Sequence, residues 1–173
     1  MFIIEPIKKE EATGELKALY VMIEKTLGFV PPHFELFATI DIDAMKDFMA
    51  YNQYMMTHSK IQKELLPFLR LYIAHKECRS YCTHFNTQIL LKMGTASDLI
   101  SDLENRIEEI PLANEQKSLL IKVLKALYKP QEFGKEDLVE LYEQAWSDKD
   151  FFDLLSYASE FTAKSKMIEV YLS

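Results

Sequence analysis

Apolar residues recur along this chain at intervals of three and four positions, a spacing that is typical of amphipathic helices. The first clear case runs from Leu16 to Leu27 and stops at Gly28, a residue type that often closes a helix. The paired prolines of GFVPPH then break the chain, and a second helix is expected over residues 43–58. The alternating pattern of strands is hard to find. The pattern therefore predicts an all-α protein of seven to nine helices.

Helix-start signals divide the rest of the chain. SKIQ at 59–62 has the form of a capping box, so a helix is expected to begin there. Pro67 should kink that helix or lie in its opening turns. TASD at 95–98 and SDKD at 147–150 repeat the start signal with Asp in place of Glu, and two amphipathic segments lie between them. With no linker or low-complexity segment, residues 1–173 are expected to form a single domain.

Composition narrows the class of protein. The 173 residues are 49% hydrophobic and 12% aromatic, which is enough for a packed core. A net charge of −7 argues against nucleic acid as a partner, because phosphate binding favours a basic surface. No apolar run approaches the roughly 20 residues of a membrane span, and the N-terminal residues lack the apolar core of a signal peptide. The expectation is a cytoplasmic protein with reduced thiols and no membrane partner.

The segment HKECRSYCTHFN, residues 75–86, holds both cysteines of the chain, Cys78 and Cys82. Four basic side chains lie close to them, against the single acid Glu77: His75, Lys76, Arg79 and His84. If the chain turns before Ser80 and a helix starts there, Cys82 lies in the first turn. The helix dipole and the cations would then lower the pKa of its thiol. His84 could accept the proton, because histidine titrates near neutral pH.

Other interpretations of the two cysteines stay open. Residues four apart on a regular helix have Cβ atoms about 5–6 Å apart, whereas a disulfide needs about 3.5–4.5 Å. Only a helix break between Cys78 and Cys82 could bring them closer. The thiols could also be inert core residues. Zinc is a further possibility, with His75, Cys78, Cys82 and His84 as ligands, but on a continuous helix His84 points to the opposite side. No metal or bound cofactor is therefore expected.

Three segments of the chain resemble one protein family. GFVPPHFELFAT, LLPFLRLYIAHKECRSYCTHFN and residues 114–167 are similar, in order and spacing, to the carboxymuconolactone decarboxylase and alkyl hydroperoxidase D-like superfamily, in particular its peroxidase-related branch. The resemblance covers nearly the whole chain. It implies a compact multi-helix alkyl hydroperoxidase D-like bundle that assembles into homo-oligomers.

The active-site motif of that family is only partly present. The motif is a Glu, then after eleven residues Cys-x-x-Cys-x-x-x-His. Aligning its second cysteine with Cys82 places the other three positions on residues of different types: Pro67, Arg79 and Asn86. The nearest residues of the required types are displaced: Glu64, Cys78 and His84. The resemblance implies that Cys82 attacks the substrate, that Cys78 resolves the product, and that a Glu and a His relay protons.

Together these features predict a thiol-dependent peroxidase or disulfide oxidoreductase. Its partners would be a small peroxide or disulfide substrate and a thiol reductant. Cys82 is the expected attacking thiolate, Cys78 the resolving thiol, His84 the proton acceptor and Glu64 a further candidate for the relay. The displaced motif also favours an alternative, a non-catalytic family member that keeps the fold as an oligomeric binding or scaffold protein.

Overall fold

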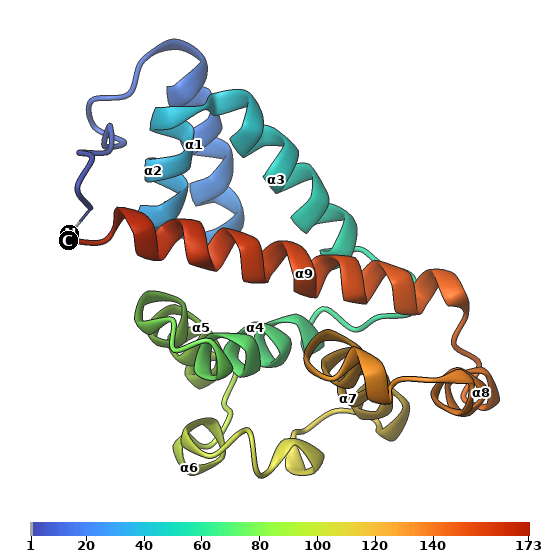
Figure 1. Cartoon of the computed structure of the whole chain (residues 1–173). Helices are drawn as coiled ribbons and strands as arrows, with labels where there is room; N and C mark the ends of the chain where they lie inside the picture. Colours follow the sequence, from blue (N-terminus) through green and yellow to red (C-terminus); the bar gives the residue numbers. More distant parts are fainter. Residues whose placement is uncertain (1) are drawn as a thin grey trace. The chain divides into compact units, whose positions relative to one another are not determined.

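The computed structural model describes residues 2–173, and within them lie nine α-helices and two short 3-10 helices (Figure 1). The extended structure in this part of the chain is limited to an isolated antiparallel bridge between Phe2 and Leu172. The predicted all-α class is confirmed. No helix among the described residues has the length and apolar character needed to cross a membrane. The chain divides into two compact units, the first up to Tyr54 together with Val170–Ser173, and the second Met55–Glu169.

The first unit contains α1 (Gly14–Leu27), α2 (Pro32–Ile40) and most of α3 (Ile42–Met56). The predicted end of α1 is confirmed, because Gly28 takes the left-handed conformation at φ 82° and its N–H bonds the carbonyl of Glu24. The core gathers around Tyr20, which is fully buried. Its neighbours there are apolar: Ala12, Leu19, Ile23, Ala38 and Met45.

The second unit holds the remaining helices. They are α4 (Leu65–Lys76), α5 (Ser80–Lys92), α6 (Ser97–Ser101), α7 (Asn114–Tyr128), α8 (Lys135–Glu143) and α9 (Asp148–Tyr171). The 3-10 helices are Ile107–Glu109 and Pro130–Glu132. Eight residues of α4 are buried, so this helix lies at the centre of the unit and packs closely against α5. The α4–α5 pair, green in Figure 1, carries the cysteine segment.

The predicted helix start at 59–62 is wrong. α4 begins only at Leu65, with Pro67 in its first turn as one of the two predicted outcomes. Side chains from outside the segment hold it in a non-helical form. His58 Nδ1 accepts two backbone N–H groups of the segment at 3.2 and 3.0 Å. Gln116 on α7 accepts a third at 3.1 Å and donates to a backbone carbonyl at 2.9 Å. Tertiary hydrogen bonds therefore override the local helix signal.

The two later start signals have different outcomes. SDKD forms a reciprocal box at the start of α9: the Ser147 N–H donates to Asp150 Oδ2 at 2.9 Å, and the Asp150 N–H donates to Ser147 Oγ at 3.2 Å. TASD does precede a short helix, α6. However, the residue at its cap is Ala96, and no side chain caps the helix.

Candidate functional site

A helix break, the condition under which the two cysteines could come closer together, is present between them. α4 ends at Lys76 and α5 begins at Ser80, so Cys78 lies in the connection and outside both helices. Its backbone is left-handed, with φ 54°. The Cys78 N–H donates to the carbonyl of His75 at 3.0 Å, and the next N–H along the chain donates to the carbonyl of Ala74 at 2.8 Å. These two bonds form a Schellman motif, which usually places glycine at this position.

A cysteine at such a position is not there to stabilise the fold. A left-handed conformation costs a residue with a Cβ atom roughly 1–2 kcal/mol, a cost that glycine avoids. Cys78 is also exposed, so its side chain does not recover that free energy by packing in the core. The interpretation of both cysteines as inert core residues therefore does not fit Cys78.

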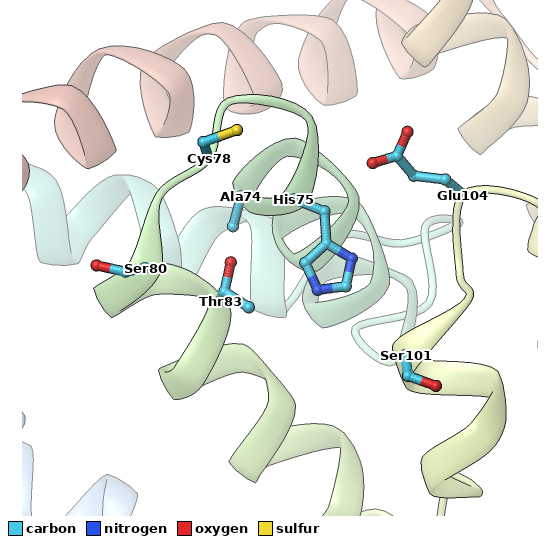
Figure 2. A pocket seen from close by; sticks show the side chains of 7 residues that line it. All are labelled: Ala74, His75, Cys78, Ser80, Thr83, Ser101 and Glu104. Carbon is cyan, nitrogen blue, oxygen red and sulfur yellow. The ribbon is translucent and has the colours of Figure 1, made fainter.

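Cys78 lines an open depression of about 500 Å³ in the second unit (Figure 2). The other lining residues come from α4, from the first turn of α5, and from the segment around the end of α6: Ala74, His75, Ser80, Thr83, Ser101 and Glu104. The lining side chains include one thiol, an imidazole, a carboxylate and three hydroxyl groups. This set can bind a small hydrogen-bonding molecule beside the sulfur.

Charges around the depression are paired. Lys76 Nζ lies 3.6 Å from Glu104 Oε2, and Arg79 Nη2 lies 3.4 Å from Glu77 Oε2. The electropositive surroundings expected from the sequence are therefore largely compensated. Three of these four charged residues lie within two positions of Cys78 in the sequence: Lys76, Glu77 and Arg79.

Cys82 has the opposite environment. It is the third residue of α5, as predicted, but its side chain is only 3% exposed. Burial raises the pKa of its thiol to about 12, and the Glu169 carboxylate adds to this rise. The guanidinium groups of Arg79 and Arg70 act in the other direction but do not compensate. The predicted lowering of the Cys82 pKa is therefore wrong, because desolvation outweighs the nearby cations and the helix start.

The two predicted relay residues, His84 and Glu64, are not among the residues that line the depression. His84 is exposed and lies two residues beyond the buried Cys82, which is about 200° around a helix. Glu64 is exposed too, just before the first residue of α4, whereas Cys78 follows its last residue. The 12 residues of that helix span about 18 Å. Both cysteines are free.

A buried polar network behind Cys82 was not expected. Asn86, which is 1% exposed, donates from Nδ2 to the backbone carbonyl of Cys82 at 2.8 Å. Arg70 on α4 donates from Nε to Asn86 Oδ1 and from Nη1 to the Tyr157 hydroxyl, each at 2.8 Å. We call these three side chains the Arg70 network. Helical spacing could have suggested the Asn86–Cys82 contact, but nothing in the sequence connects α4 with Tyr157 on α9.

Sequence reasoning also missed part of the depression. The sequence indicates His75 only as a nearby cation or metal ligand. It gives no signal for Glu104, which lies 26 residues after Cys78 with no motif around it. Among residues 2–173, no group of three or more His, Cys, Asp and Glu side chains is arranged to hold a metal ion.

Two solved structures share this architecture. An uncharacterized peroxidase-related protein from Silicibacter sp. TM1040 matches with a TM-score of 0.75 and 18% identity, covering 97% of this chain and 85% of that one. The alkylhydroperoxidase AhpD core of an uncharacterized peroxidase-related protein from Ralstonia eutropha JMP134 matches with a TM-score of 0.75 and 17% identity, covering 96% and 88%.

Neither the protein-family models nor the curated proteins match this sequence. The structural likeness, at 17–18% identity, therefore speaks for the fold. The fold implied by the sequence resemblance is confirmed over nearly the whole length of the chain: the protein has the alkyl hydroperoxidase D-like fold of peroxidase-related proteins.

Proposed function

We propose that this protein is a thiol-dependent oxidoreductase, a peroxidase or disulfide reductase, in which Cys78 meets the substrate. The observation that carries the proposal is the position of Cys78. Its side chain is exposed, its backbone is left-handed, and it lines the same depression as His75. The fold is that of proteins described as peroxidase-related. The proposal reverses the roles implied by the sequence resemblance, because Cys82 is buried and its thiol holds its proton at neutral pH.

The reaction needs two thiols and an external reductant. The Cys78 sulfur attacks one oxygen of a peroxide, the O–O bond breaks, and water or an alcohol leaves while Cys78 becomes a sulfenic acid. We assign the role of proton acceptor to His75, the histidine that lines the same depression. The Cys82 thiol then displaces water from the sulfenic sulfur, which forms a Cys78–Cys82 disulfide. A thiol reductant returns both cysteines to the reduced state, and its own thiols become a disulfide.

Stoichiometric oxidation tests this order of events. We expect Cys82→Ser, treated with one equivalent of hydrogen peroxide and trapped with dimedone, to carry the sulfenic acid adduct on Cys78. Wild type should instead give an intramolecular disulfide, and Cys78→Ser should consume no peroxide above buffer. Each single variant is the matched control for the other. Equal peroxide consumption by Cys78→Ser and wild type would contradict the proposal.

A second candidate is a non-catalytic protein that keeps this fold as an oligomeric binding or scaffold module. The displaced motif favours it, since neither Glu64 nor His84 lines the depression that contains Cys78. It predicts that replacing both cysteines by serine leaves the homo-oligomer unchanged, as measured by light scattering, and that wild type reacts with peroxide no faster than free cysteine.

A further inference from the structure

The Arg70 network joins three helices of the second unit behind one cysteine. Asn86 bonds the Cys82 carbonyl within the first turns of α5, Arg70 brings in α4, and Tyr157 brings in α9. Asn86 is 1% exposed, so its amide cannot exchange its protein partners for water without moving. The position of Cys82 is thus coupled to hydrogen bonds that reach across the unit.

A Cys78–Cys82 disulfide cannot form without disturbing this arrangement. The bond requires Cβ atoms about 3.5–4.5 Å apart, yet the side chain of Cys78 is exposed and that of Cys82 is buried. Cys78 precedes α5, whereas Cys82 belongs to its first turn, which has no side-chain cap. Opening this turn is the shortest route for the Cys82 sulfur to leave the core. The same opening moves the Cys82 carbonyl away from Asn86.

We propose that the Arg70 network holds Cys82 in its buried, reduced position, so that oxidation of the cysteine pair is coupled to release of Asn86 and Arg70. This inference rests on the proposed function for its redox step. In that step two thiols lose two electrons and two protons to an oxidant, either a peroxide or oxidised glutathione. The oxidant is reduced to water and an alcohol, or to two glutathione thiols. Asn86 is then a positioning residue that favours the dithiol form.

The opening of the first turn of α5 can be measured without any catalysis. In a Cys78→Ser background, Cys82 is labelled with iodoacetamide and followed by mass spectrometry. Removing the amide with Asn86→Ala should increase the labelling rate of Cys82 by about tenfold, the effect of losing one buried hydrogen bond. Removing the hydroxyl with Tyr157→Phe, one step further along the network, should increase it by about threefold.

Tyr142→Phe is the matched control, since its exposed hydroxyl bonds Asp148 at the start of α9. It should leave the labelling rate unchanged. The free energy of unfolding is measured for each variant. The fold-increase in labelling rate is compared with the fold-increase in the unfolded fraction that the loss of unfolding free energy implies. A labelling increase no larger than that would overturn the proposal, and so would unchanged labelling in both network variants. If Asn86→Ala fails to fold, Tyr157→Phe carries the test.

The redox coupling has its own readout. In glutathione buffers, Asn86→Ala with both cysteines present should shift the equilibrium toward the Cys78–Cys82 disulfide by about tenfold relative to wild type. A shift toward the dithiol, or no shift, overturns the coupling. Failure of the proposed function is a separate result, because it appears as absent peroxide consumption while the labelling rates still report on the network.

Discussion

The α4–α5 and α8–α9 junctions are alike where the first helix ends. Cys78 has φ 54° and Ala145 has φ 64°, and these are the two non-glycine residues with positive φ in the described chain. At the second junction, the Ala145 N–H donates to the carbonyl of Tyr142 at 2.9 Å, and the Trp146 N–H donates to the carbonyl of Leu141 at 3.0 Å. Both helices therefore end in a Schellman motif without the usual glycine.

The junctions differ where the next helix begins. α9 starts with the Ser147–Asp150 box, and Lys60 Nζ also reaches Asp150 at 3.1 Å. α5 has no side-chain cap. The third residues of the two helices, Asp150 and Cys82, are both buried. The pKa of Asp150 is lowered although its burial acts to raise it, because hydrogen bonds from Ser147 and Lys60 outweigh burial.

The pKa of Cys82 moves the other way, to about 12, because no comparable donors compensate its burial. A place in the first turn of a helix is thus insufficient to favour an ionised group. Direct hydrogen bonds decide whether the pKa rises or falls. The Asp150 carboxylate accepts such bonds from Ser147 and Lys60, whereas no comparable bond lowers the pKa of the Cys82 thiol. The following predictions test this difference, from the largest effect to the smallest.

Alkaline pH should destabilise the protein through Cys82. A thiol whose pKa is raised on folding contributes stability that is fully present below the ordinary value of 9.0 and is lost as the pH rises toward about 12. We expect the free energy of unfolding in urea, with reductant present, to fall by about 1.4 kcal/mol per pH unit in this range. Cys82→Ser should lose this slope between pH 9 and 10, below the pH at which the raised pKa values of Tyr20 and Tyr128 add a slope of their own, and Cys78→Ser should keep it. The same slope in both variants would refute the burial argument.

Removing the hydrogen-bonded box between Ser147 and Asp150 at the start of α9 should lower the free energy of unfolding by a smaller amount. Asp150→Asn weakens the bonds from Ser147 and the ion pair with Lys60, so we expect a loss of about 2 kcal/mol in urea unfolding at pH 7. The stability from the lowered pKa of Asp150 is fully present above the ordinary value of 3.8 and is lost as the pH falls from there toward the pKa of the folded state, so the difference from wild type should narrow in that range. Asp148→Asn is the control, an exposed residue of the same turn that should change stability little. If the difference in unfolding free energy between Asp150→Asn and wild type did not change with pH, the lowered pKa of Asp150 would be contradicted.

Glycine at the two left-handed positions should produce the smallest effect. Cys78→Gly and Ala145→Gly should each raise the free energy of unfolding by about 1 kcal/mol, since glycine removes the steric cost of the conformation. Each variant is the control for the other, because the two motifs have the same pattern of backbone hydrogen bonds. If only Cys78→Gly were destabilising, the Cys78 side chain would make a stabilising contact, and the proposed role of an exposed reactive thiol would weaken.

Much of the helix framework was predictable from local sequence. The end of α1 at Gly28, the box at Ser147 and the break between the cysteines each depend on residues within about five positions of one another. The start signal at 59–62 failed because His58 and Gln116 supply competing hydrogen bonds, and Gln116 lies more than 50 residues away in the sequence. Local signals hold where no distant side chain competes for the same backbone groups.

The sequence by itself determined the all-α class, the end of α1 at Gly28 and the resemblance that proved correct for the fold. Tertiary structure alone decided which cysteine meets solvent. The pKa of Cys82 depends on burial and on Glu169, which is 87 residues away, and the network behind it pairs Arg70 with Tyr157 across the same separation. Desolvation is a property of the packed molecule, so the segment that first suggested an activated Cys82 could not reveal that Cys78 is the accessible thiol.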